Sequence, residues 1–77
     1  MTMMELRQMR NRAPFRPLDV HLTTGEVLAV QHPDNMSIPA PDDGKEADLF
    51  VVWTHHRWNL VEAGQVARLS VEVDFPN

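Results

Sequence analysis

Residues 18–31 read LDVHLTTGEVLAVQ, and they carry the clearest β-hairpin pattern, around which the rest of the predicted fold is arranged. Its first five residues alternate apolar and polar side chains, which is typical of a strand with one buried face. A polar turn with Gly25 follows, and a glycine there can adopt positive φ without a side-chain clash. The chain becomes apolar again over residues 27–31. The stretch therefore predicts an antiparallel β-hairpin.

A short amphipathic helix is predicted before the hairpin, over residues 3–11. Thr2 and Glu5 have the spacing of a capping box, in which each side chain satisfies a free amide of the first turn. One apolar stripe is expected to pack on the core, with the arginines of the helix in solvent. The stripe consists of Met3, Leu6 and Met9, widened by Met4. Residues 14–17, PFRP, then stop the helix, because proline has no amide to donate.

Four further strands are predicted after the hairpin. They cover residues 36–38, 49–53, 58–62 and 66–75. The last one alternates most regularly, with apolar side chains at every second position from Leu69 to Phe75. The strand at residues 49–53, LFVVW, is apolar at consecutive positions, so both of its faces are expected to be covered. The helix or another subunit would supply the second cover.

These elements predict an α+β fold in a single domain, residues 1–77. The N-terminal helix precedes a strongly twisted antiparallel β-meander of five to six strands, or a small, partly open barrel. A chain of 77 residues buries only about 60% of the surface that its unfolded form exposes. It also has no cysteine, so no disulfide can compensate. Self-association into a homo-oligomer is therefore an expected way to bury more surface.

Composition limits where the protein is expected to be located and which classes of partner it is expected to bind. The first twelve residues hold no long apolar run, so neither a signal peptide nor a membrane span is predicted, and the expected location is the cytoplasm. The formal net charge is −4, from 11 acidic and 7 basic residues, so a polyanion would be repelled overall. Nucleic acid is thereby disfavoured as a partner, and a membrane is not expected.

No catalytic, metal or cofactor site is predicted. The acids of residues 42–48 do not follow the order of a calcium-binding loop. Ser37 and Ser70 lie in strand-like contexts without the glycine pattern of a nucleophile. The four histidines lack the spacing of known zinc motifs. They are His21, His32, His55 and His56. The chain is therefore expected not to be an enzyme.

The remaining feature is WTHHRW at residues 53–58, where two indoles flank a cationic turn. Tryptophan and arginine are common in interaction hot spots, and aromatic rings can also stack on bases. The indoles can instead pair across a tight hairpin inside the core, which is the favoured interpretation because a small domain needs its large side chains for burial. The candidate interaction residues are Trp53, His55, His56, Arg57 and Trp58.

The segments PFRPLDVHL at residues 14–22 and VQHP at residues 30–33, with the turn at Gly25 between them, resemble a family of short uncharacterised bacterial proteins. In that family a helix precedes P-F-x-P, a strand ending in H, a glycine turn and V-x-H-P. Residues 66–73 are similar to its closing strand, whereas residues 39–48 lie outside the match. The resemblance implies a bacterial protein with a shared fold. It transfers no functional residue, because the family has no established activity.

A second, weaker similarity is to Sm-like and SH3-like small barrels, which also place a short helix before a strongly bent meander. The polar base-binding residues of the Sm motifs are missing at their usual spacing. A likeness of this kind implies a fold and little about function.

The sequence therefore predicts a non-enzymatic protein-interaction or self-association module that uses residues 49–53 and the region of Trp58. The alternative is an Sm-like nucleic-acid-binding protein, in which several arginines would line one face beside an exposed tryptophan. Those arginines are Arg57, Arg68 and the helix residues Arg7, Arg10 and Arg12. A metal protein or enzyme built on the histidines ranks last.

Overall fold

The computed structural model describes residues 1–73 and contains one helix, six strands and two short 3-10 turns in that range. In chain order they are α1 (Met3–Arg10), β1 (Leu18–Leu22), β2 (Val27–Val30), η1 (Pro33–Asn35), β3 (Met36–Ser37), β4 (Leu49–Thr54), β5 (Arg57–Glu62), η2 (Ala63–Gln65) and β6 (Val66–Val71). None of the helices in these 73 residues is long and apolar enough to cross a membrane.

The strands form two three-stranded antiparallel sheets, so the predicted α+β class is confirmed and the predicted meander is only partly right. One sheet has the order β2-β1-β6 and the other has the order β3-β4-β5. The turn η1 begins at Pro33, which cannot donate to a ladder, and it separates β2 from β3. Strand β6 returns to pair with β1 instead of extending the second sheet. The two sheets do not close into a barrel.

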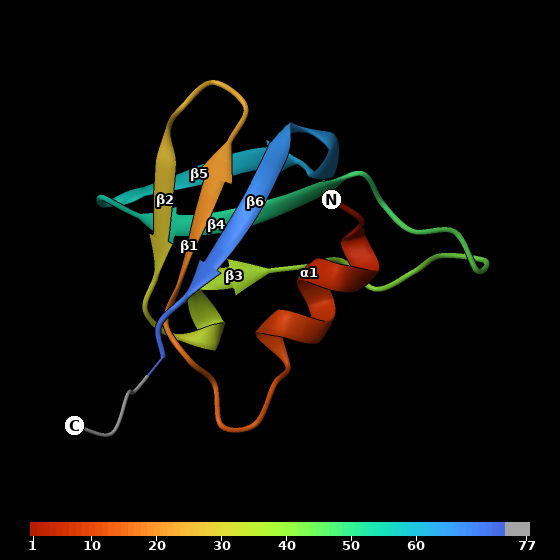
Figure 1. Cartoon of the computed structure of the whole chain (residues 1–77). Coiled ribbons are helices and arrows are strands. Elements are labelled where there is room, and N and C mark those ends of the chain that lie inside the picture. Colours follow the sequence, from red (N-terminus) through yellow and green to blue (C-terminus); the bar gives the residue numbers. More distant parts are fainter. Residues whose placement is uncertain (74–77) are drawn as a thin grey trace.

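The hydrophobic core lies between the two sheets, whose strands cross at a steep angle in Figure 1. Side chains from both sheets and from α1 meet there. The largest fully buried ones are Leu6, Val20, Leu28, Val30, Met36, Phe50 and Val52. No polar or charged residue among those described is buried, so apolar burial is what holds the sheets together.

Helix α1 closes the core beside β6 and β3 (Figure 1). The predicted capping box is present, since Glu5 N donates to Thr2 Oγ1 at 3.2 Å and Thr2 N donates to Glu5 Oε1 at 3.1 Å. Leu6 is fully buried and Met9 is half-buried, as the stripe predicted. Met4 is 59% exposed, so including it in the stripe was wrong. It precedes Leu6 by two residues and thus lies about 200° around the helix from it.

Two helix arginines make hydrogen bonds instead of staying in solvent, Arg7 to the segment between β3 and β4 and Arg10 to β3 itself. Arg7 forms an ion pair with Glu46, and its Nη2 donates to Pro39 O at 2.7 Å. Arg10 Nε donates to Met36 O at 2.6 Å. The bonds of Arg7 fix the segment against α1 near both of its ends, and that of Arg10 holds β3 beside the helix. They also remove two arginines from the set that the nucleic-acid alternative needs.

Arg7→Ala is expected to raise the pKa of Glu46 toward its ordinary value. The hydrogen bonds from the Arg7 guanidinium stabilise the carboxylate and lower the pKa of Glu46. The contact is therefore present above the ordinary pKa of a glutamate and is lost as the pH falls through the lowered pKa of Glu46. An NMR titration of the Glu46 carboxyl carbon measures this change. Arg12→Ala is the control, and an unchanged Glu46 midpoint in Arg7→Ala would contradict the pairing.

Strand β6 ends at Val71, four residues before the end of the predicted strand. Glu72 N still donates to Pro17 O at 3.0 Å, but Pro17 has no amide with which to continue the ladder. Val73 is 54% exposed and does not join the buried face. The predicted positions Asp74 and Phe75 lie outside the described residues.

Candidate interaction surface

The sheet β3-β4-β5 has one face in the core and one face that no other described element covers. Phe50, Val52 and Val61 point inward and are buried. Their neighbours along β4 and β5 point the opposite way, because successive side chains of a strand alternate between the two faces. We call this outer set the Trp face. It consists of Leu49, Val51, Trp53, Trp58 and Leu60.

The expectation that both faces of residues 49–53 are covered is therefore wrong for the single chain. The helix lies at the end of the core beside β6 and β3, away from the Trp face. Trp58 is 65% exposed, Leu60 74% and Leu49 45%. Continuous apolar surface of this kind, with polar residues around it, is typical of an interaction site.

The two tryptophans pair directly across the β4–β5 hairpin. Their ring centroids are 4.7 Å apart and their planes are tilted by 48°, which lies within the range of favourable aromatic pairs. The cross-strand pairing is as predicted. The preferred location in the core was wrong, because Phe50 and Val52 occupy the inward positions and alternation places Trp53 outside.

A strained two-residue turn closes this hairpin. Its residues, His55 and His56, have φ values of 56° and 60°. Two successive positive φ values define a type I′ turn, which favours asparagine and glycine over residues with larger side chains. The turn follows Thr54 and precedes Arg57, which pair across the strands. The five candidate interaction residues thus lie together at the tip of one hairpin, with both histidines, Arg57 and Trp58 exposed.

Replacing the turn by Asn-Gly (His55→Asn with His56→Gly) is expected to stabilise the protein by about 1–2 kcal/mol, because it relieves positive φ at two side-chain-bearing residues. The melting temperature should rise by about 4–8 °C for each kcal/mol. Thermal unfolding followed by circular dichroism measures the change. The control replaces both histidines by alanine, which keeps the strain and should give no gain. A loss of stability in the Asn-Gly variant would contradict the turn type.

Opposite charges lie at the two ends of the β4–β5 hairpin, but on different faces of the sheet. The hairpin tip carries Arg57 and the two histidines. The other end carries Glu62, which lies opposite Leu49, and Asp48, whose carbonyl oxygen accepts a hydrogen bond from Ala63 N at 2.8 Å. The side chains of Arg57, Glu62 and Asp48 are all exposed. Arg57 pairs with Thr54 and directly precedes Trp58, so strand alternation places it on the opposite face of the sheet from Trp58 and Glu62.

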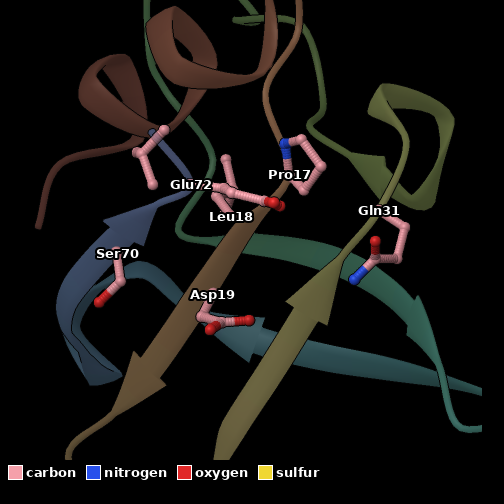
Figure 2. A pocket seen from close by; sticks show the side chains of 7 residues that line it. Pro17, Leu18, Asp19, Gln31, Ser70 and Glu72 are labelled. Carbon is pink, nitrogen blue, oxygen red and sulfur yellow. The ribbon is translucent and has the colours of Figure 1, made fainter. Parts of the chain in front are cut away.

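The other sheet has a polar hollow where β1 begins, with a volume of about 410 Å³ (Figure 2). Figure 2 shows that Asp19, Gln31 and Ser70 reach it from three neighbouring strands or their ends. Within the described residues, every buried side-chain polar atom has a hydrogen-bond partner. No such atom in the hollow therefore needs a ligand to complete its hydrogen bonding. The hollow is therefore a weaker candidate than the Trp face.

A serine–histidine contact lies next to this hollow. His21 Nε2 and Ser70 Oγ are 2.8 Å apart, and Asp19 lies opposite Ser70 on the neighbouring strand. Nucleophilic catalysis also needs a group that orients the histidine. Within residues 1–73, His21 makes no hydrogen bond to a carboxylate. This contact could not be predicted from the sequence, because residues 21 and 70 are brought together only by the β1–β6 pairing.

The histidines and arginines are spread over separate surfaces. His21 lies on one sheet, His32 precedes η1, and the other two histidines form the hairpin turn. In the part of the chain that the structure covers, no three histidine or acidic side chains gather as metal ligands do. Arg68 lies on β6 and Arg57 at the hairpin tip, so the arginines named above do not line one face.

The chain was also compared with known proteins. No protein-family model, curated protein or solved structure matches it. The family resemblance of residues 14–33 therefore stays a prediction, and the function has to be inferred from the surface itself.

Proposed function

We propose that this chain is a non-enzymatic protein-interaction module, and that the Trp face is its binding surface. The observation that carries the proposal is the exposure of Trp58 and Leu60, at 65% and 74%, on a sheet whose other face buries Phe50, Val52 and Val61 in the core. A tryptophan offers about 250 Å² for contact, more than other side chains, and is enriched in interaction hot spots. We also propose that the protein is located in the cytoplasm, as expected from the sequence.

The arrangement of charge supports a protein rather than a nucleic acid as the partner. A protein that binds a phosphate backbone needs several cations along one groove. Arg57 is the one arginine or lysine within β4 and β5, and it lies on the opposite face of the sheet from Trp58 and Leu60. The net charge of −4 adds overall repulsion toward a polyanion.

Site-specific photo-crosslinking tests this function in cells that naturally express the protein. A photoreactive phenylalanine analogue replaces Leu60 at the centre of the Trp face. The matched control carries the same analogue at Val27, which is 42% exposed on the other sheet. We expect covalent protein adducts at position 60 and none, or far fewer, at position 27.

Each result of the crosslinking has a defined meaning. Adducts of discrete mass at position 60 support the proposal, and their mass separates self-association from a different partner. Equal labelling at both positions indicates non-specific contact and would overturn the proposal. The absence of any adduct at position 60 in a folded, photoreactive protein would overturn it as well.

A further inference from the structure

The free edge of β6 borders a groove next to α1. Strand β6 pairs with β1 on one side, and no described strand pairs with its other side. Helix α1 and β6 run side by side in Figure 1, and a hollow of about 430 Å³ lies between them. We call this hollow the α1–β6 groove. Its lining includes Met1, Gln8, Met9, Arg68, Leu69 and Val71.

Backbone groups of β6 point into the α1–β6 groove. Glu72 N donates to Pro17 O, so the backbone of Glu72 faces β1. Successive residues of an antiparallel strand face opposite neighbours, so Ser70 also faces β1, whereas Leu69 and Val71 face the groove. Because β1 is the one described neighbour of β6, the N–H and C=O groups of Leu69 and Val71 have no strand to pair with. The backbone of a further extended segment is complementary to such an edge.

The floor of the groove is apolar and only partly covered. Leu69 and Val71 lie opposite the buried residues Val20 and Leu18, so their side chains point to the core side of the sheet. Together with Met9 of α1 they pack against the core and stay half-buried. A strand added next to β6 would place every second side chain over this floor. The floor therefore favours apolar side chains at alternate positions.

Arg68 sets the charge that the added segment should carry. It lies opposite His21, on the outer face of the sheet, where it is exposed and forms no ion pair within residues 1–73. Its backbone faces β1, so a residue opposite it on an added strand would form a non-hydrogen-bonded pair, in which side chains are closest. Opposite charges in such a pair are favourable and like charges are not. An acidic residue is therefore complementary to Arg68.

We infer that the α1–β6 groove binds an extended segment of a partner protein, which adds to the sheet as an antiparallel strand next to β6. The segment carries apolar side chains opposite Leu69 and Val71 and an acidic side chain opposite Arg68. Because α1 borders the groove on its other side, a single segment fits there better than the edge of a second copy's sheet. The groove and the Trp face belong to different sheets, so this inference goes beyond the proposed function and does not rest on it.

A nuclear magnetic resonance titration with a synthetic peptide tests the inference. The probe is Ser-Val-Thr-Val-Glu-Val-Ser, whose first two valines would pair with Val71 and Leu69 and whose glutamate would face Arg68. The backbone amide signals of Leu69 and Val71 should shift, because these amides gain hydrogen bonds. The amide of Ser70 already faces β1 and should shift much less. A control peptide with N-methyl groups on the first two valines cannot donate these bonds and should not cause the shifts.

Charge reversal tests the acidic position of the segment. Arg68→Glu should weaken binding of the probe by about tenfold, because it places like charges opposite each other. A peptide with lysine in place of glutamate should show the reverse preference and bind the variant about tenfold more tightly than the wild type. Arg57→Glu, on the other sheet, is the control and should leave both affinities within about twofold of the wild type.

The outcomes separate this inference from the proposed function. Unchanged signals of Leu69 and Val71 at millimolar peptide would overturn the inference, and so would equal shifts with the N-methylated peptide. Shifts confined to Trp58 and Leu60 would place the peptide on the Trp face, which overturns the inference and supports the proposed function. Shifts of Leu69 and Val71 that depend on protein concentration without peptide would show that a second copy fills the groove, contrary to the inference. A failure of crosslinking at position 60 would overturn the Trp face alone.

Discussion

Phe50→Ala is expected to destabilise the domain by about 3–5 kcal/mol, because it removes the largest fully buried side chain and leaves a cavity between the two sheets. A domain of this size has a total stability of about 4–12 kcal/mol, so much of the variant can be unfolded at ambient temperature. Urea unfolding followed by far-ultraviolet circular dichroism measures the loss. The midpoint should fall while the dependence on urea stays the same.

The matched control is the preceding residue of the same strand. Leu49→Ala removes an apolar side chain of similar size from the Trp face, which is exposed in the single chain. At concentrations where the protein is monomeric, its stability should change by no more than about 0.5 kcal/mol. Equal losses in the two variants would mean that the outer face of β4 is covered within one chain, contrary to the structure.

Leu6→Ala is expected to destabilise the protein by about 2–5 kcal/mol and to release α1 from the core. Leu6 is fully buried, and it holds the helix against both sheets together with Met3. Eight residues are too few for a stable helix in water without such packing. Amide hydrogen exchange in residues 3–10 should therefore become faster, and the melting temperature of the protein should fall.

Met4→Ala is the control for the helix. Met4 is largely exposed on the far side of α1, and alanine favours the helix slightly more than methionine does. Its stability should stay within about 0.5 kcal/mol of the wild type, and exchange in the helix should not change. If Leu6→Ala left hydrogen exchange in α1 unaltered, the capping box and the arginine contacts would be sufficient to hold the helix.

Local chemistry is where the sequence was most informative. The capping box of Thr2 and Glu5, the alternation in β1 and the turn around Gly25 each involve residues within a few positions of one another. Their structure follows from hydrogen bonding and sterics over short distances, so the sequence pattern is sufficient. The pairing of the two tryptophans was predictable for the same reason, because a two-residue turn places its flanking strand residues opposite each other.

Errors arose where a side chain had to be assigned to one of two surfaces. The run LFVVW shows that β4 is apolar, but it does not show which of its faces meets a second sheet. That depends on where β1, β2 and β6 lie, since their inward residues fill the space next to Phe50 and Val52. The same limit applies to Arg7 and Arg10, whose acceptors lie at least 26 residues further along the chain.

The helix, the strands, their turns and the apolar character of residues 49–60 could be predicted from the sequence, because they depend on residues that are close together along the chain. The tertiary structure alone decided that the strands divide into two sheets, with β6 beside β1. It also decided that the tryptophans lie outside, on the face of β4 and β5 that is turned away from the core. The physical reason is that burial depends on which distant segments share the core, and 73 described residues enclose only one such core.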